Sequence, residues 1–400
     1  MNPLEPETFV FVEPYFTRIG HNVEYSSNIF LGARERVRVQ FVISSDASTR
    51  DAAGLLTASY PEIIDRSHDY VFNGSFTKRL SMFLDAIFTV IRRINDKSGK
   101  TLVFLAYEPF ILLFLLPFLG FRRVLLVDHS CIYLDYFEWN RKSAYKFLSR
   151  YFVRRLARDR RIYFVVHSEY HRRCLSAVIP EKEARILEIE YGCTVFPWTE
   201  RSIVADGERM ILLPGIWRRE KGIHFFLEHF PAELLRSRYR IVIAGFPQEF
   251  PAAELTDIAR RRNIAGKIEI IDRYLDKDSL RALYVRATYV VLPYLPSYSG
   301  GAGPLKDACG HGCPVLVSDA AGLGQIVNDH RIGITYRAGD PDDFVCAVLR
   351  MDETMENGGL ILFSEQAHRY AEEISWPRFA QKLVSIGLDP AVSVKGSTCL

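Results

Sequence analysis

Glycines and charged side chains follow two short apolar runs in the second half of the chain. The run TYVVLPY at 288–294 leads into LPSYSGGAG, where Gly300, Gly301 and Gly303 fall within four positions. Glycines let the backbone approach a ligand closely, and the amides at the start of the helix expected from residue 304 favour an anion. A phosphate group is therefore the ligand expected at this loop, and a plain flexible loop is the alternative.

Asp307 stands one turn inside that expected helix. From this position its carboxylate could accept hydrogen bonds from vicinal hydroxyls, such as the diol of a ribose. The alternative is an acid that only complements the positive end of the helix dipole.

Cations follow the other apolar run. In LLPGIWRREKGIHFFLEHF the strand is expected to end at Gly215, and Arg218, Arg219 and Lys221 precede an amphipathic helix. Cations at the mouth of an α/β cleft suit a diphosphate, because charge-assisted hydrogen bonds strengthen where water is excluded. A solvated basic loop is the alternative interpretation.

Short β-rich runs alternate with helical patterns along the whole chain, which is typical of mainly parallel sheets covered by helices on both faces. We expect strands at 9–16, 38–45, 101–107, 123–130, 161–168 and 184–192, and then at 210–216, 239–246, 267–273, 288–294, 314–319 and 333–338. Helices are expected at about 20–31, 75–96, 109–119, 141–158 and 169–178, and then at 221–235, 251–263, 277–287, 304–312, 323–328 and 359–386. The fold class is therefore α/β with two Rossmann-like units facing each other across a cleft, and such folds bind ligands at the carboxyl ends of the strands.

The composition is that of a globular protein. Of 400 residues, 48% are hydrophobic and 25% are charged, which excludes a disordered or fibrous chain. The 51 Lys and Arg against 48 Asp and Glu leave a net charge of +3, whereas a dedicated nucleic-acid binder usually has a larger basic excess. Seven cysteines without a CxxC pair indicate reduced thiols and not a disulfide framework or a zinc site.

Two features bear on membranes. The chain does not open with a basic start followed by an apolar block, so we expect no signal peptide and a cytoplasmic protein. The apolar stretch at 109–121 is too short to span a bilayer, and it suits either a buried helix or a helix that touches a membrane face.

The segment 141–161 has nine Arg or Lys and one acid. Four of its apolar residues fall on one stripe of the expected helix, namely Tyr145, Leu148, Phe152 and Leu156. The stripe could pack on the sheet, or the helix could lie peripherally on an anionic membrane surface at the inner face of the plasma membrane. The helix at 75–97 could contribute to the same face.

Five motifs follow one another over about 150 residues of the second half: PGIWRREKG, AGFP, YLDKDSLRALYVRATYVVLPY, SGGAGPLKDACGHGCPVLVSDAAGLGQIV and GDPDDF. In this order they resemble the nucleotide-sugar half of GT-B retaining glycosyltransferases, especially glycosyltransferase family 4. The resemblance implies an acceptor-binding domain at 1–198 and a nucleotide-sugar-binding domain at 210–375. We expect the linker between them at 199–209, where the apolar periodicity lapses and polar residues cluster. The resemblance further implies a helix at 376–387 that crosses back to the first domain, before a loose tail at 388–400.

The resemblance assigns a donor site, with two departures from the family pattern. The family's two glutamates, separated by seven residues, correspond to Ser299 and Asp307. Asp307 keeps a carboxylate for the ribose, whereas Ser299 lacks the carboxylate that the family places near the donor sugar. The arginine that usually follows the first glycine is Ile216 here, and Arg218 or Arg219 could supply the missing guanidinium.

Other positions carry over directly from the family. Lys221 matches the lysine that neutralises the leaving diphosphate. The remaining donor-binding positions are Gly215 in the first loop, Tyr274 and Leu275 flanking the base, and Gly300 and Gly301 facing the diphosphate.

Two DxD triplets, at 276–278 and 340–342, could hold a divalent cation in transferases of the other major fold. Both precede expected helices and are interpreted as caps. We therefore predict no metal, and no cofactor besides the nucleoside-diphosphate-sugar that serves as substrate.

The first half resembles the family more weakly. FVEPYFTRIGHNVEYSSNIF resembles the first strand and glycine turn, which puts Gly20 near the donor phosphate. RVLLVDHSCIYL resembles the strand whose last histidine points into the cleft, and it nominates His129 for a sugar hydroxyl or for developing charge. A structural histidine is the alternative. We interpret Ser168 as the N-cap of the following helix.

The function that these features imply is retaining transfer of a sugar from a nucleoside diphosphate to a hydroxyl of a glycan or lipid-linked acceptor, in polysaccharide or glycolipid assembly. The catalytic candidates are His129, Lys221 and Ser299. A GT-B-like binding or partner subunit that has lost catalysis is a second hypothesis, and a sugar-nucleotide epimerase of the same architecture is a third.

Overall fold

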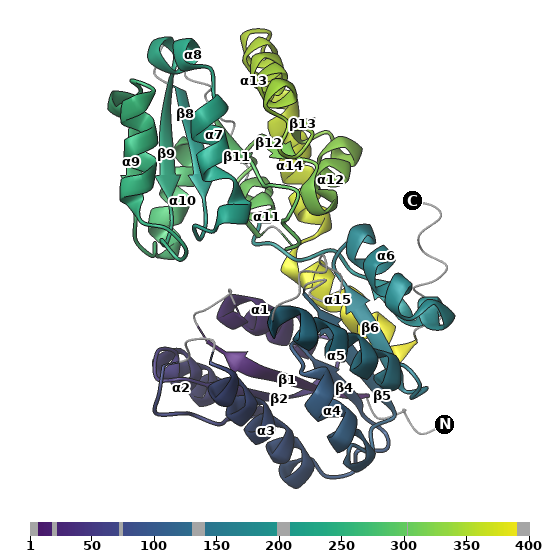
Figure 1. The fold of residues 1–400 in the computed structure, drawn as a ribbon. Coiled ribbons are helices and arrows are strands. Elements are labelled where there is room, and N and C mark those ends of the chain that lie inside the picture. Colours follow the sequence, from purple (N-terminus) through teal and green to yellow (C-terminus); the bar gives the residue numbers. More distant parts are fainter. Residues whose placement is uncertain are drawn as a thin grey trace. The chain divides into compact units, whose positions relative to one another are not determined.

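The computed structural model describes residues 7–17, 22–71, 75–129, 141–197, 209–301 and 303–389. These form two compact units (Figure 1). The first comprises residues 1–192 together with 376–400, and the second comprises residues 193–375.

The first unit is built on a parallel sheet of seven strands in the order β3-β2-β1-β4-β5-β6-β7. The strands are β1 Thr8–Phe16, β2 Arg38–Ser45, β3 Ile63–Asp65, β4 Thr101–Phe104, β5 Arg123–Asp128, β6 Ile162–Val166 and β7 Ile186–Glu188. Neighbouring strands pair in parallel throughout. Strand β1 shows why both faces of the sheet are covered. Phe9 and Phe11 enter one buried cluster while Val10 and Val12 enter the other, so alternate side chains serve two cores.

Helices cover both faces of this sheet (Figure 1). They are α1 Asn22–Arg34, α2 Arg50–Ser59, α3 Phe76–Arg93, α4 Pro109–Leu115, α5 Arg141–Leu156, α6 Glu169–Val178 and α15 Trp376–Leu388, with 3-10 turns η2 Leu116–Phe118 and η3 Pro180–Arg185. The last of them, α15, packs against α1. A Cβ on Gly32 would lie 2.6 Å from the Cβ of Ala380, so glycine permits the close approach of the two helices. The predicted return of the C-terminal helix to the first unit is confirmed.

The second unit is a parallel sheet of six strands in the order β10-β9-β8-β11-β12-β13. The strands are β8 Arg209–Pro214, β9 Tyr239–Ala244, β10 Ile268–Ile271, β11 Tyr289–Leu292, β12 Val315–Ser318 and β13 Gly333–Tyr336. The helices are α7 Ile223–His229, α8 Ala232–Ser237, α9 Ala252–Arg261, α10 Lys277–Arg286, α11 Gly303–Gly310, α12 Leu323–His330, α13 Pro341–Glu356 and α14 Leu360–Glu373, with 3-10 turns η4 Arg219–Lys221, η5 Ala265–Lys267 and η6 Ala320–Gly322. The expected pair of parallel Rossmann-like sheets is confirmed.

Several expected elements differ from those observed. Helix α2 and the three-residue strand β3 were not expected, and the single helix expected at 221–235 is two helices. Pro231, which has no N–H to donate, lies at the break between α7 and α8. The contacts divide the chain after Gly192, and Phe196 of the expected first domain donates its N–H to Gly310 of the second unit. Residues 198–208 of the expected linker and 390–400 of the expected tail lie outside the described residues.

Candidate functional site

The two loops singled out in the second unit lie side by side at the carboxyl edge of its sheet. Strands β8 and β11 are neighbours, so the segments that follow them meet. The N–H of Leu295 donates to the carbonyl of Glu220 over 2.9 Å. Gly222 has φ +68°, and a Cβ there would stand 1.8 Å from the carbonyl oxygen of Pro293, so glycine is required at this position.

Lys221 occupies the junction of the two loops. Its side chain is buried and its Nζ donates to the hydroxyl of Tyr294 over 3.0 Å. The amine also lies 4.4 Å from the ring centre of Tyr294 and 5.1 Å from that of Tyr298. Burial, helped by the charge of Arg218, lowers the pKa of Lys221 to about 7. The ammonium is therefore poised to gain from an anionic partner.

The two arginines of this loop have different surroundings. Arg219 pairs with Glu254 of α9 at 2.8 Å, and its N–H donates to Glu249. Arg218 pairs with Glu220 at 3.1 Å. Its Nε is buried and has no hydrogen-bond partner in the described part of the chain. Because its charge acts on Lys221, Arg218 lies near the amine, and it is the better candidate for a ligand's phosphate.

The glycine loop and α11 complete this group. Ser299, Gly300 and Gly301 are all partly buried, and a Cβ on Gly300 would lie 2.6 Å from the hydroxyl of Tyr298. Gly215, with φ +115°, lies close enough to α11 that a Cβ would contact Pro304 at 3.5 Å. Both predicted motifs therefore border the start of α11.

Asp307 is partly exposed on α11. Burial raises the pKa values of Tyr284 and Tyr294 well above the usual range, and the charge of Asp307 adds to the effect on both. Asp307 thus lies close to the tyrosine that accepts from Lys221. The loop that carries Arg218 and Lys221 thus meets the glycine loop and the start of α11, the helix that carries Asp307.

Tyr274 and Leu275 follow β10, which is the edge strand of the same sheet. The ring of Tyr274 is 61% exposed, whereas Leu275 is partly buried against the core. An exposed aromatic ring at the carboxyl edge is available for stacking.

The DxD triplets are helix caps, as predicted. Asp276 accepts from the N–H of Ser279 at the start of α10, over 2.7 Å. Asp340 accepts from the N–H groups of Asp342 and Asp343 at the start of α13. Within the described ranges, no group of three or more His, Cys, Asp or Glu side chains could hold a metal ion.

In the first unit, His129 follows β5 and makes two contacts through its ring nitrogens. Nε2 lies 2.7 Å from the carbonyl oxygen of Leu105, and Nδ1 lies 3.0 Å from Nε2 of His167. Burial lowers the pKa of His129 to about 4. Sequence reasoning did not nominate His167, although it ends RIYFVVH just as His129 ends RVLLVDH.

Glu13 is a further buried acid near the carboxyl end of β1 that the sequence did not single out. Its carboxylate accepts from the hydroxyl of Ser26 and from the N–H of Tyr15. Burial raises the pKa of Glu13 to about 7. Ser168 is the N-cap of α6, as expected, because its Oγ accepts from the N–H of His171. Gly20 lies outside the described residues.

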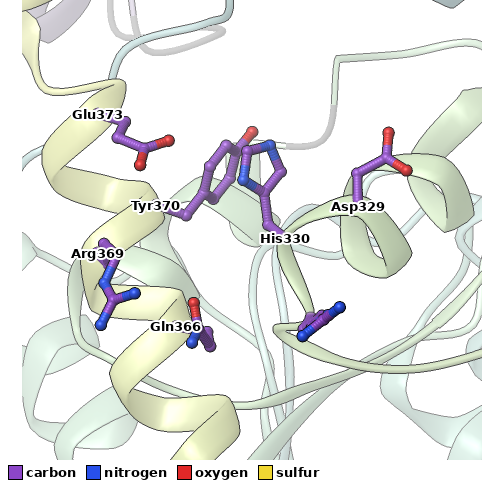
Figure 2. Close-up of a pocket in the computed structure, with 7 residues that line it drawn as sticks. Asp329, His330, Gln366, Arg369, Tyr370 and Glu373 are labelled. Atoms are coloured by element: carbon purple, nitrogen blue, oxygen red, sulfur yellow. The ribbon is translucent and has the colours of Figure 1, made fainter. Parts of the chain in front are cut away.

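A cavity of about 380 Å³ lies elsewhere in the second unit (Figure 2). Its lining comes from the end of α12, from Arg331 and from α14. Helix α12 runs back from the carboxyl end of β12, so the cavity lies toward the amino ends of the strands. Tyr370 in its wall accepts a hydrogen bond from buried Lys306 of α11, and the ring of His330 lies 4.0 Å from it. None of the predicted donor residues lines this cavity.

Known proteins match this chain in sequence and in fold. Residues 208–353 match the family model described as glycosyl transferases group 1. An uncharacterized glycosyltransferase of Methanocaldococcus jannaschii is 29% identical over 187 residues, which is 46% of this chain and 46% of that protein. The match therefore spans less than half of the length of this relative.

Two solved structures are similar along most of the chain. Sucrose-phosphate synthase from Thermosynechococcus elongatus has a TM-score of 0.75 at 14% identity, covering 97% of this chain and 100% of that one. HepE of Anabaena in complex with UDP has a TM-score of 0.67 at 11% identity, covering 95% and 98%.

The class of protein follows from the two parallel Rossmann-like sheets and the C-terminal helix that packs on the first of them: this is the GT-B fold. The motif resemblance to group 1 glycosyltransferases of the family 4 type is confirmed, and the matching segment contains Lys221, Ser299 and Asp307.

Proposed function

We propose that the chain is a retaining glycosyltransferase that moves a sugar from a nucleoside-diphosphate-sugar to a hydroxyl of a glycan or lipid-linked acceptor. The observation that carries the proposal is the grouping of buried Lys221, Arg218 and the glycine loop at the start of α11. It lies in the segment that matches the family model. The UDP complex of the structurally similar HepE makes a uridine nucleotide the first donor to test.

The leaving diphosphate accounts for these groups chemically. Negative charge grows on the diphosphate as the bond to the sugar breaks, and preorganised cations and amides stabilise it. One such donor can contribute about 3 to 4 kcal/mol to the barrier. Lys221 and Arg218 would supply the cations, and the amides near Gly300 and Gly301 would supply the neutral donors. Asp307 would accept from the ribose hydroxyls, and Tyr274 would stack on the base.

If this chain is catalytic, it works without the carboxylate that the family places near the donor sugar. Ser299 stands where the family has a glutamate, and it supports the second hypothesis of a binding or partner subunit. In the transferase, Ser299 would offer a hydroxyl to the sugar, and His129 would act on developing charge, because both of its ring nitrogens are already engaged.

Donor hydrolysis separates the two hypotheses. Purified protein is incubated with a panel of UDP-, GDP- and ADP-sugars, and release of free nucleoside diphosphate is followed. A transferase hydrolyses its donor slowly without an acceptor, and Lys221→Ala lowers this rate by about tenfold or more. The matched control is Arg219→Ala, whose side chain is occupied by Glu254. Nucleotide binding without any hydrolysis would favour the binding subunit.

A membrane surface is the second partner that we propose. Six large apolar side chains of α4, η2 and α5 are between 51% and 66% exposed, and we call them the aromatic face: Phe110, Phe114, Phe118, Phe147, Leu148 and Tyr151. Helices α4 and α5 pack against each other (Figure 1). The rings of Phe110 and Phe152 lie 4.9 Å apart, so the face continues from one helix to the other.

One residue of the stripe expected on the helix at 141–158 belongs to the aromatic face. Among residues 147–156 of α5, Ser149, Val153 and Leu156 are buried, whereas Leu148 of the expected stripe is 51% exposed. Basic residues without a single acid accompany this face from 141 to 158. Exposed aromatic rings beside a cationic helix fit the interface of an anionic bilayer, into which the rings insert while the arginines meet lipid phosphates. No helix among the described residues is long and apolar enough to cross a membrane.

A further inference from the structure

A chain of ring contacts crosses the carboxyl edge of the first sheet. The carbonyl of Leu105 follows β4, His129 follows β5, His167 follows β6 and the carbonyl of Ile189 follows β7, and these strands are consecutive neighbours. Nε2 of His129 lies 2.7 Å from the Leu105 oxygen, and Nδ1 of His167 lies 3.0 Å from the Ile189 oxygen. The two rings meet through Nδ1 of His129 and Nε2 of His167, 3.0 Å apart.

These three contacts require three protons. A carbonyl oxygen only accepts, so the two outer nitrogens must both carry hydrogen. A third hydrogen is needed between the facing nitrogens, because two lone pairs at 3.0 Å repel. Two neutral imidazoles carry only two N–H groups, and both are used at the carbonyls. The full set of hydrogen bonds therefore forms only when the pair holds one additional proton.

We propose that His129 and His167 act as one unit that shares a proton and carries a single positive charge, and that His167 is the positioning residue that fixes the His129 ring. The shared proton can sit on either facing nitrogen without movement of the rings. The proposal rests on the proposed function in that His129 is the member assigned to the reaction.

Aromatic rings and a further histidine lie around the pair. His167 is buried and His129 is partly exposed. The ring of Tyr25 from α1 is 4.7 Å from that of His129, and the ring of Tyr191 is 5.3 Å from that of His167, both nearly perpendicular. Phe379 of α15 lies 5.8 Å from His167 and contributes no charge. The charge of His171 of α6 lowers the pKa of His129, in addition to the larger effect of burial.

Coupled groups of this kind lose their protons in two separate steps. The one additional proton completes the set of three hydrogen bonds. A further proton would place two cationic rings with their facing nitrogens 3.0 Å apart in a poorly solvated place. Burial opposes even a single charge and lowers the pKa of His129 to about 4, so the three hydrogen bonds must outweigh this effect for the pair to hold the additional proton.

The pair changes what His129 can offer to a substrate. Both of its nitrogens are already engaged, so a free ring nitrogen for a sugar hydroxyl, as the sequence suggested, is not present in this arrangement. The pair offers a fixed positive charge at the carboxyl edge instead. The chemistry that fits is an anionic group, such as a phosphate or an oxygen on which negative charge develops.

The charge of the pair is measured by nitrogen NMR of the histidine rings in the full-length protein at pH 7.5, where an ordinary histidine is mostly neutral. His129→Gln and His167→Gln assign the signals. We expect the two outer nitrogens to be protonated and the two facing nitrogens to share a third proton. The shifts of the facing nitrogens should then lie between those of protonated and free nitrogen. Two protonated and two free nitrogens at this pH would overturn the proposal, whether or not the protein transfers sugar.

Kinetics then test the role of His167. The amide of His167→Gln can donate to His129 but cannot hold the additional proton, so it separates placement of the ring from its charge. We expect kcat to fall by about 10- to 100-fold with little change in the donor KM, and the alkaline limb of the wild-type pH profile to disappear. His224→Gln, in the second unit, is the control. Full kcat and an unchanged pH profile in His167→Gln would show that the pair's charge has no part in turnover.

Discussion

The amine of Lys221 lies 3.0 Å from the hydroxyl of Tyr294, and the same amine stands over the rings of Tyr294 and Tyr298. Aromatic faces attract a cation, but burial opposes the charge and lowers the pKa of Lys221 to about 7. In the free protein near neutral pH the amine is thus divided between its two protonation states. A bound diphosphate would shift it to the charged state.

The first prediction concerns the pH dependence of nucleotide binding. Because the ligand favours charged Lys221, binding above pH 7 must take up a proton, and the affinity for UDP should fall by up to about tenfold for each unit between pH 7 and 9. Calorimetry at pH 8 in two buffers of different ionisation heat measures the proton. Lys221→Arg stays charged and should lose this dependence. Equal apparent heats in the two buffers for the wild type would disprove the linkage.

The second prediction concerns Asp307 and the ribose. If its carboxylate accepts from the ribose hydroxyls, Asp307→Ala should weaken UDP binding by about 10- to 100-fold. The same substitution should have little effect on a dideoxyribose analogue of UDP, because the hydroxyls are already missing. Asp278→Ala, on an exposed turn of α10, is the control. An equal loss for both nucleotides would assign Asp307 a general electrostatic role and not ribose recognition.

The third prediction concerns Gly222, which joins the loop of Arg218, Arg219 and Lys221 to α7. Alanine at φ +68° is strained, and its Cβ would overlap the carbonyl of Pro293. Gly222→Ala should therefore lower the free energy of unfolding by about 2 kcal/mol or more and should weaken nucleotide binding. Gly266→Ala is the matched control, because nothing lies within 4 Å of its Cβ position. Thermal melts of the two variants give the comparison, and equal melting temperatures would contradict this account of Gly222.

The sequence predicted the parts of the fold that depend on local patterns. Apolar runs such as RVQFVISS at Arg38–Ser45 became strands with the expected bounds, because a buried parallel strand is apolar on both faces. Strand β3 escaped notice because three residues, Ile63–Asp65, show no periodicity. The prediction of one helix at 221–235 did not take Pro231 into account, although proline rarely continues a helix.

The sequence could predict candidate site residues that lie within one motif. It could not predict contacts between residues that are far apart in the sequence. Lys221 was nominated from its own loop, and Asp307 from the helix that follows the glycine loop. Arg219 pairs with Glu254 because α9 packs beside α7, and this pairing leaves Arg218 as the candidate near the amine. No local sequence pattern predicts that packing. The His129–His167 contact likewise joins residues 38 positions apart, and only the order of β5 and β6 in the sheet brings them together.

The last prediction concerns the aromatic face of the first unit. The full-length protein should sediment with vesicles of phosphatidylcholine and phosphatidylglycerol, and less with phosphatidylcholine alone, because the arginines of α5 add about 1 kcal/mol each near an anionic surface. The double change Phe110→Ser with Phe114→Ser should abolish most of the binding, since both side chains are more than half exposed. Arg155→Gln at the end of α5, together with Arg158→Gln just after it, should weaken it by about 30-fold and reduce its sensitivity to salt.

A control in the second unit distinguishes lipid binding by the aromatic face from non-specific binding by any exposed apolar side chain. Leu349 and Leu362 are 50% and 53% exposed there, outside the aromatic face, so their double change to serine removes apolar surface without touching α4 or α5. Vesicle binding should survive this change, and each variant should keep the melting temperature of the wild type. Equal losses in the Phe110/Phe114 and Leu349/Leu362 variants would mean that no particular face binds lipid. Equal binding to anionic and neutral vesicles would mean that the arginines of α5 take no part.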